Sequence, residues 1–134
     1  MADRLHSAAI HLLRRLRVED EALGISAPRL STLSVLVIGG PRRVGELAEA
    51  EQVEPPTMTR LVDGMERDGY VVRGSDPGDG RAVVVRATAK GVRALNQGRA
   101  RRVEALASTL RALSPTELRT LVAGVDVLER AISD

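Results

Sequence analysis

The side chains best suited to chemistry in this sequence are the threonines and arginines of residues 54–68. Arg60 follows Thr57 and Thr59 closely within this segment. A guanidinium can donate a forked pair of hydrogen bonds to guanine O6 and N7, and a threonine can contact bases or phosphates through its hydroxyl and methyl groups. These residue types are suited to contact with a nucleic acid duplex, and they also occur on ordinary surface helices.

The apolar residues of the same segment predict the element that positions these side chains. They recur three and four residues apart, at Met58, Leu61, Val62 and Met65. This spacing predicts an amphipathic helix that begins at Pro55 and ends before Gly69. The face opposite the apolar stripe then presents Pro56, Arg60, Asp63 and Arg67. Two interpretations of this face stay open: a recognition helix in a major groove, or a surface helix with an Asp63–Arg67 ion pair.

A second segment places Asp79 and Arg81 at the tip of a predicted β-hairpin. β-branched runs at 70–73 and 82–86 flank the turn-rich residues 74–80, a pattern typical of a hairpin with a long tip. A guanidinium on such a ribbon can enter a narrow minor groove, and a neighbouring carboxylate can hold it in one orientation. The alternative is a surface turn with a local Asp79–Arg81 ion pair. The hairpin favours the first interpretation.

A further short helix is expected directly before these two elements. Residues 44–51 place Val44, Leu47 and Ala48 on one face, and Gln52-Val53 forms a tight connection. Two short helices followed by a hairpin make a winged helix-turn-helix, in which the hairpin is the wing. Arg42 and Arg43, at the start of the first of these helices, either touch the DNA backbone or form a solvated pair.

Helical periodicity and capping residues predict the rest of the frame. One helix is expected over 4–23, and a second after Ser26 that buries Leu30, Leu33, Leu36 and Val37 and ends at Gly39-Gly40-Pro41. Thr88 can cap a fifth helix, and Gly98 inside this helix is an unfavourable residue that could interrupt it. Ser114-Pro115-Thr116-Glu117 is a capping box that starts a last helix.

Apolar seams on the first and last helices suit packing against a partner helix. The residues expected at a dimer interface are Leu5, Leu12, Leu16, Leu121, Val125, Leu128 and Ile132. The polar face of the last helix mixes charges of both signs, which disfavours a membrane-surface helix. The N-terminus lacks the apolar stretch of a signal peptide, and the longest apolar run, 35–38, is too short to span a bilayer. We therefore expect a cytoplasmic protein that does not engage membranes.

Other kinds of site find little support. The sequence has no Cys, which excludes disulfides and thiolate metal ligands. His6 and His11 lie five residues apart without a cluster of carboxylates. Residues 39–43 lack the Gly-Lys-Ser/Thr of a phosphate-binding loop, and no Ser, His and acid set indicates nucleophilic catalysis. We expect no enzymatic activity, no cofactor and no metal.

Composition narrows the type of nucleic acid. The 134 residues, enough for one domain, include one Tyr and neither Phe nor Trp, so there are almost no aromatic platforms for stacking the bases of single strands. The net charge is only +2, and residues 41–93 hold equal numbers of basic and acidic side chains. Affinity for phosphates must then come from where the charges lie.

These motifs together resemble the MarR family. Leu47-Ala48-Glu49, Pro55 through Asp63, and Met65 through Arg73 are similar to that family's helix-turn-helix and first wing strand. Asp79-x-Arg81, followed by Ala87-Thr88-Ala89-Lys90-Gly91, is similar to its wing and to the start of its next helix. The match runs from about 44 to 91, and the flanking helices fit the same layout.

The resemblance implies a mainly α winged helix-turn-helix fold, with about six helices, a two-stranded wing and an intertwined homodimer. Residues 1–24 and 92–134 would dimerise, and residues 26–91 would bind DNA. Members of the family usually repress nearby genes by covering a palindromic operator. Many release DNA when a small, often phenolic, ligand enters a cleft between the two parts.

By position in the family motif, Thr57, Thr59 and Arg60 would face bases. Arg81 would enter the minor groove with support from Asp79. Arg73 and Lys90 would lie near phosphates. The full set expected at DNA is Pro55, Pro56, Thr57, Thr59, Arg60, Asp63, Arg73, Asp79, Arg81, Lys90, Arg42 and Arg43.

Three residues depart from the family pattern. Glu54 stands where Ser is usual, and it either faces phosphates or caps the following helix. Gly80 replaces a frequent Arg, and Ala87 replaces the usual Leu. The balanced charge of residues 41–93 keeps open a second function, a winged-helix module that dimerises or docks proteins without binding DNA; an enzyme subunit is the weakest alternative.

Overall fold

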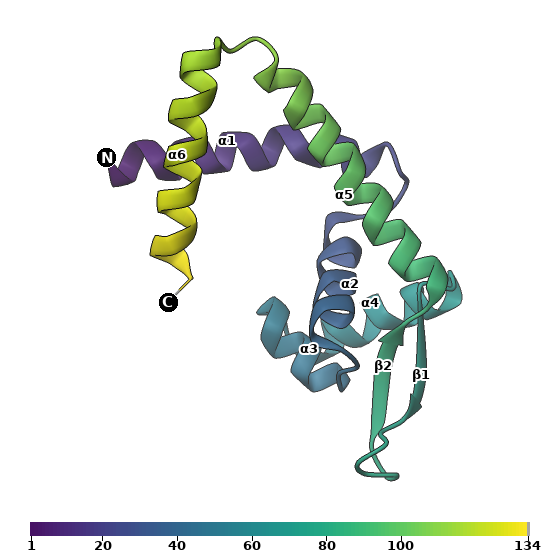
Figure 1. Cartoon of the computed structure of the whole chain (residues 1–134). Helices are drawn as coiled ribbons and strands as arrows, with labels where there is room; N and C mark the ends of the chain where they lie inside the picture. Colours follow the sequence, from purple (N-terminus) through teal and green to yellow (C-terminus); the bar gives the residue numbers. More distant parts are fainter. Residues whose placement is uncertain (134) are drawn as a thin grey trace. The chain divides into compact units, whose positions relative to one another are not determined.

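The computed structural model describes residues 1–133, which form six helices and one two-stranded sheet (Figure 1). This confirms the predicted mainly α fold with a hairpin. The elements in chain order are α1 (Ala2–Glu21), α2 (Ala27–Gly39), α3 (Val44–Glu51), α4 (Pro55–Arg67), β1 (Val71–Ser75), β2 (Val83–Ala87), α5 (Ala89–Leu110) and α6 (Pro115–Ile132).

The chain divides into two compact units, one ending at Arg102 and the other beginning at Val103. The first unit contains α1 to β2 and most of α5, and the second contains the rest of α5 and α6. The expected division into dimerisation helices and a DNA-binding lobe depends on a partner chain, so it stays a prediction.

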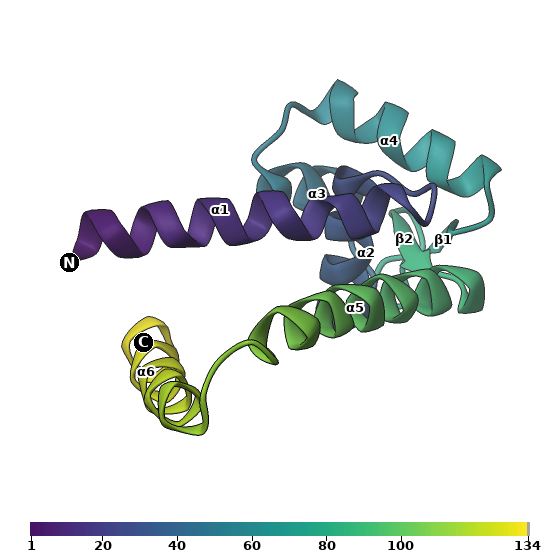
Figure 2. The ribbon, with the colours of Figure 1, turned by 90° about the horizontal axis from the view of Figure 1, so that it is seen from above.

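The core of the first unit lies among α2, α3, α4 and the hairpin. Leu33, Leu47, Met58, Val62 and Met65 are fully buried there, which confirms the apolar stripes expected for these helices. Figure 2 shows α4 at the edge of this unit with α3 and α2 on its inner side. Burying one stripe leaves the opposite face of α4 exposed to solvent.

The predicted burial of Val37 was wrong, since this residue keeps 37% of its surface exposed. Val37 lies four residues after Leu33, on the same side of α2, but it is close to the end of the helix at Gly39 and packs neither in the hydrophobic core nor against it.

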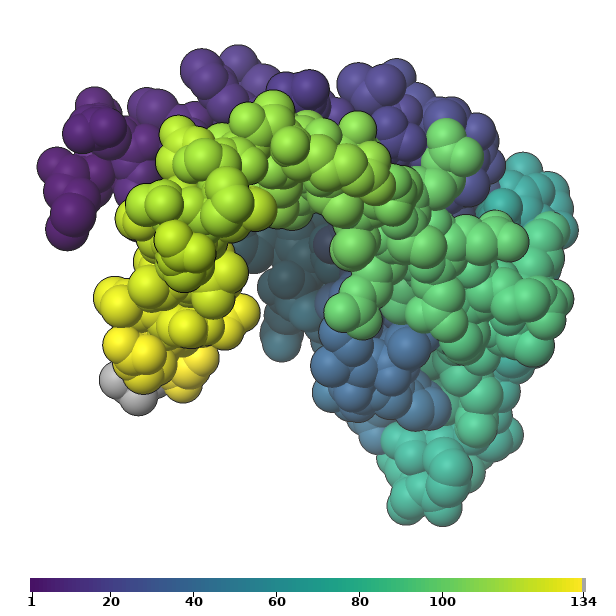
Figure 3. Space-filling view, turned by 45° about the horizontal axis from the view of Figure 1, so that its top comes forward, coloured from purple at the N-terminus to yellow at the C-terminus, as the bar shows by residue number. Residues whose placement is uncertain are grey.

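The hairpin has a third backbone partner that periodicity did not predict. β1 and β2 pair antiparallel, with Arg73 opposite Val85. The other edge of Val85 pairs with Arg42: its N–H donates to the Arg42 carbonyl at 2.7 Å, and its carbonyl accepts from the Arg42 N–H at 3.1 Å. The connection between α2 and α3 is thereby fixed to the middle of β2, where Val85 is buried. The end of the hairpin projects at the surface of the molecule (Figure 3).

The start of α5 is clamped to the start of β1 by Thr88 and Gly91. The Thr88 hydroxyl lies 2.6 Å from the Gly69 carbonyl oxygen and accepts from the Gly91 N–H at 3.1 Å. A Cβ on Gly91 would overlap the Tyr70 carbonyl oxygen, so only glycine fits. Gly98 does not interrupt α5, which is continuous through it.

The second unit has a well-capped helix and little buried apolar surface of its own. The Ser114 N–H donates to the Glu117 carboxylate at 2.8 Å, and the Glu117 N–H donates to the Ser114 hydroxyl at 3.3 Å, which confirms the capping box. The Ser114 hydroxyl also donates to the Glu117 carboxylate at 2.7 Å; this bond, and after it the bond from the Ser114 N–H, holds the pKa of Glu117 below its ordinary value. No described residue of α6 is buried. Among residues 1–133, no helix is both long and apolar enough to cross a membrane.

Candidate nucleic-acid interface

The exposed face of α4 carries the residues expected at bases. Pro55, Pro56, Thr57, Thr59 and Arg60 are all exposed. Glu54 is the N-cap by position, but its side chain makes no capping hydrogen bond. The Thr59 hydroxyl donates to the Pro55 carbonyl at 3.0 Å, so it keeps acceptor capacity and a methyl group for a ligand.

The acidic residues of α4 are held by Arg73 of the wing. The Arg73 guanidinium lies 2.6 Å from Asp63 and 2.8 Å from Glu66, and the Arg73 N–H donates to Glu66 at 3.0 Å. The Asp63–Arg67 pair considered from the sequence was therefore wrong, since Asp63 pairs with Arg73. Partial burial lowers the pKa of Arg73, but the hydrogen bonds that its guanidinium donates to Asp63 and Glu66 outweigh this effect, and the net shift of the pKa is upward.

The C-terminal end of α4 is fixed by two further cations. Arg29 of α2 passes over Gly64 and pairs with Asp68 at 2.6 Å. This hydrogen bond holds the pKa of Asp68 below its ordinary value. The Lys90 ammonium donates to the Asp68 carbonyl oxygen at 2.7 Å and lies 4.8 Å from the centre of the Tyr70 ring. A cation at this end also complements the helix dipole.

The hairpin tip places its carboxylates on its own backbone and on Arg43. Asp79 accepts from the Arg81 N–H at 3.1 Å, and its other oxygen lies 3.7 Å from the Arg43 guanidinium. Asp76 accepts from the Gly78 N–H at 2.9 Å and pairs with Arg43 at 3.3 Å. The pKa of Asp76 is held below its ordinary value, mainly by the hydrogen bond from the Gly78 N–H and to a smaller extent by the Arg43 guanidinium.

These contacts differ from two alternatives considered from the sequence, an ion pair between Asp79 and Arg81 and a solvated pair of Arg42 and Arg43. Within residues 1–133, the side chains of Asp79 and Arg81 form no ion pair with each other; Asp79 supports Arg81 through its backbone N–H. Arg43 does not form a solvated pair with Arg42: it stays partly exposed, but its guanidinium pairs with the tip carboxylates. The Arg42 guanidinium instead donates to the Pro41 carbonyl at 3.3 Å.

The charged side chains of this surface thus fall into two groups, ion pairs that hold the structure together and arginines without a carboxylate partner among residues 1–133. Five of its acids face structural cations: Asp63 and Glu66 face Arg73, Asp68 faces Arg29, and Asp76 and Asp79 face Arg43. Glu54, the exposed residue before α4, forms no ion pair among residues 1–133. In the described part of the chain, no ion pair involves Arg60, Arg67 or Arg81. The balanced formal charge therefore leaves exposed, uncompensated guanidinium groups on α4 and on the wing tip.

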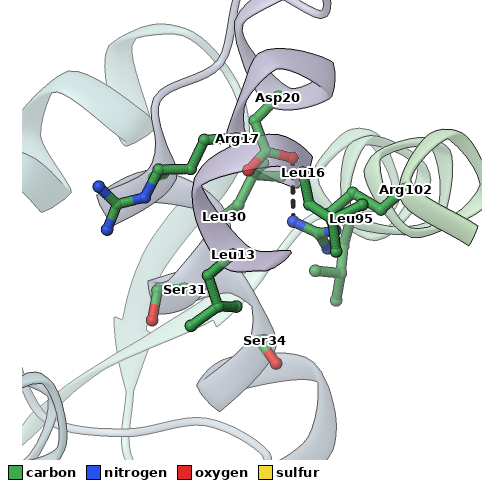
Figure 4. Close-up of a pocket in the computed structure, with 10 residues that line it drawn as sticks. Leu13, Leu16, Arg17, Asp20, Leu30, Ser31, Ser34, Leu95 and Arg102 are labelled. Atoms are coloured by element: carbon green, nitrogen blue, oxygen red, sulfur yellow. Dashed lines mark hydrogen bonds and ion pairs between the residues drawn. The ribbon is translucent and has the colours of Figure 1, made fainter. Parts of the chain in front are cut away.

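The first unit contains a pocket whose lining residues were not predicted from the sequence. It has a volume of about 390 Å³ between α1, α2 and α5, and Leu13, Leu16, Leu30 and Leu95 form apolar walls. Figure 4 shows Asp20 and Arg102 meeting at one side, with Arg17 directed away from them. Asp20 is 6% exposed and lies 2.9 Å from the Arg102 guanidinium.

The sequence did contain one signal for this pair. Asp20 lies four residues after Leu16, so it continues the apolar stripe of the first helix. An acid in such a position requires a cationic partner. Among residues 1–133, no group of three or more His, Asp or Glu side chains could hold a metal.

Comparison with known proteins identifies the family to which the chain belongs. A MarR family model matches residues 23–82. An uncharacterized HTH-type transcriptional regulator of Mycobacterium bovis is 34% identical over 128 residues, which are 96% of this chain and 90% of the relative. A similarly named protein of Mycobacterium leprae is 31% identical over 134 residues, which are 100% of this chain and 94% of the relative.

Solved structures with similar folds lead to the same family. A MarR family protein from Bacillus stearothermophilus superposes with a TM-score of 0.82 and 28% identity, covering 99% of this chain and 93% of that one. A MepR variant from Staphylococcus aureus, solved bound to an oligodeoxyribonucleotide, shares the fold with a TM-score of 0.75 and 20% identity, covering 98% of each chain. With its helix-turn-helix, its wing and these relatives, the chain belongs to the MarR family of transcriptional regulators.

Proposed function

We propose that two copies of the chain bind one palindromic DNA duplex and repress the genes nearby. The observation that carries this proposal is the separation of charges described above. Acids of α4 and the wing face structural arginines, while Arg60, Arg67 and Arg81 are exposed and have no carboxylate partner within residues 1–133. Phosphate backbones attract such uncompensated cations.

In this proposal α4 enters the major groove with its N-terminal half. Arg60 donates to a guanine, while Thr57 and Thr59 contact bases or phosphates. Pro55 and Pro56 bring the start of the helix close to the DNA, and Arg81 enters the minor groove. Arg42 lies near the phosphate backbone of the DNA. Arg73 and Lys90 act mainly by holding α4, since their charged groups already have partners.

The proposal assigns the exposed apolar residues of α1 and α6 to a dimer interface. Leu5 and Leu12 of α1 keep 47% and 42% of their surfaces exposed. On α6 the values for Leu121, Val125, Leu128 and Ile132 are 40%, 44%, 37% and 72%. Leu16 lies on the same helix as Leu5 and is half-buried. A two-fold axis would place two copies of α4 about 10 base pairs apart.

We further propose that a small apolar compound releases the DNA by entering the pocket between α1, α2 and α5 (Figure 4). Its leucine walls suit a ring, and the Ser31 and Ser34 hydroxyls can orient polar groups on it. A regulator of this kind acts on the chromosome without catalysis, so we place it in the cytoplasm and assign it no enzymatic reaction.

Salt titration of duplex binding tests the proposal. Each phosphate contact contributes roughly 0.9 to the slope of log affinity against log salt, so several contacts give a steep fall between about 50 and 200 mM salt. Arg60→Ala and Arg81→Ala should both weaken binding, whereas Arg99→Ala, an exposed arginine of α5, should not. A flat slope with unchanged affinities would instead support a protein-interaction module without DNA binding.

A further inference from the structure

Arg43 occupies a position that joins two parts of the DNA-binding surface. It directly precedes α3, and the residue before it, Arg42, is paired through its backbone with Val85 of the hairpin. This backbone pairing fixes the Arg43 Cα next to the wing. The Arg43 N–H also donates to Glu46 at 3.3 Å, which ties the residue to the first turn of α3.

The two carboxylates of the wing tip meet Arg43 in the same way. In Asp76, one oxygen accepts from the Gly78 N–H at 2.9 Å and the other lies 3.3 Å from Arg43. In Asp79, one oxygen accepts from the Arg81 N–H at 3.1 Å and the other lies 3.7 Å from Arg43. Each carboxylate therefore links the backbone of the tip to one guanidinium outside the hairpin.

We propose that Arg43 is the positioning residue of the wing, and that it presents Arg81 to the minor groove by holding Asp76 and Asp79. This inference rests on the proposed DNA-binding function and assigns Arg43 a role other than phosphate contact. Arg81 follows Asp79 by two residues, so fixing Asp79 fixes the backbone from which the Arg81 side chain extends. Arg43 also neutralises two carboxylates that would otherwise repel phosphates.

The three side chains lie at the surface, so the contact can be tested by substitutions that leave the hydrophobic core intact. Arg43 is 49% exposed, and Asp76 and Asp79 are 25% and 53% exposed. Exposed pairs contribute little to global stability, so an Arg43 variant should fold. For the carboxyl titration without DNA, the matched control is Arg42→Gln, which removes the same charge one residue away while keeping the backbone pairing with Val85. Because Arg42 is itself proposed to lie near phosphates, the control for duplex affinity is Arg99→Gln, in an exposed arginine of α5.

The test is a double-mutant cycle on duplex affinity between Arg43→Gln and the double variant Asp76→Asn/Asp79→Asn. If Arg43 acts through the tip, Arg43→Gln weakens binding roughly two- to fivefold in the otherwise wild-type chain. It then has almost no effect when both carboxylates are already amides. Equal losses in the two backgrounds would identify a phosphate contact and overturn the proposal. Arg43→Lys, which keeps the charge, should restore part of the loss.

A DNA-free measurement separates this inference from the proposed function. NMR titration of the Asp76 carboxyl should give a pKa that rises toward the ordinary value in Arg43→Gln and stays unchanged in Arg42→Gln. An Asp76 pKa that is the same in wild type and Arg43→Gln would show that Arg43 does not hold the tip. If the wild type binds no duplex at low salt, the DNA-binding function and the role of the wing both fail, and the titration alone reports the ion pair.

Discussion

Asp63 and Arg73 lie ten residues apart in sequence and form an ion pair of 2.6 Å between α4 and β1. The same guanidinium holds Glu66 at 2.8 Å. The contact keeps two carboxylates of α4 paired with a cation, and it fixes the orientation of the helix relative to the wing. A family-based assignment places Arg73 near phosphates, whereas the geometry gives it a role in shaping the surface.

Substitution of Arg73 tests this role. Arg73→Gln should lower the free energy of unfolding by about 1 kcal/mol, the upper part of the range for partly exposed ion pairs. It should also weaken duplex binding, because Asp63 and Glu66 then face the phosphates without a cation. Urea unfolding and a duplex titration measure the two effects.

The control for Arg73 is Arg67→Gln, which removes an exposed arginine of α4 that forms no ion pair within residues 1–133. It should leave stability nearly unchanged. Equal stabilities of the two variants would mean that the Arg73 contacts contribute nothing measurable.

Gly91 should tolerate no side chain. Gly91→Ala brings a Cβ onto the Tyr70 carbonyl oxygen and within 2.9 Å of Leu33, and backbone cannot move aside as a flexible side chain can. We expect a loss of about 1–3 kcal/mol in unfolding free energy. Gly45→Ala, in the first turn of α3 with no atom within 4 Å of the added Cβ, should be neutral or stabilising. A Gly91→Ala variant as stable as Gly45→Ala would contradict the close packing of α5 on β1.

The Arg29–Asp68 pair should make stability depend on pH. Because Arg29 lowers the pKa of Asp68 from 3.8, the pair stabilises the fold above the unfolded pKa, and this contribution is lost as pH falls through the folded one. The difference in stability between wild type and Arg29→Gln should therefore be present at neutral pH and shrink below 3.8. Urea unfolding at several pH values measures it. A difference that does not change with pH would show that Arg29 stabilises by packing alone.

The buried Asp20 should be sensitive to loss of its charge. Asp20→Asn leaves the Arg102 guanidinium without its carboxylate at 2.9 Å, and removal of one partner of a buried pair costs about 3 kcal/mol or more. Arg102 is 29% exposed and can reach water, so we expect a smaller loss of about 1–2 kcal/mol. Glu19→Gln, which affects a longer pair of 3.4 Å with Arg101, is the control and should cost less. Thermal unfolding of both variants measures the two losses of stability, and equal losses would contradict the special role of the buried Asp20.

Local patterns in the sequence predicted the elements, because helix periodicity, capping residues and turn chemistry act over a few residues. The bounds of α3, the capping box at Ser114 and the hairpin are all confirmed on that basis. Partners could not be predicted in the same way. Arg43 meets Asp76 and Asp20 meets Arg102 only after the chain has folded, 33 and 82 residues apart.

For the same reason the sequence predicted which residue types lie on the exposed face of α4 but not which charges are free. Val37 illustrates a second limit of periodicity. Its position in the helix predicted burial, but periodicity does not show whether another element covers that position, and Val37 is exposed.

Selection of bound duplexes from a random pool tests the central claim most directly. If two copies of α4 and of the Arg81 wing contact one duplex, the selected sequences should contain an inverted repeat with half-sites about 10 base pairs apart. Arg60→Ala should relax the preference at the base pairs that it contacts. Enrichment of unrelated sequences, or no retention of any duplex at low salt, would contradict the account.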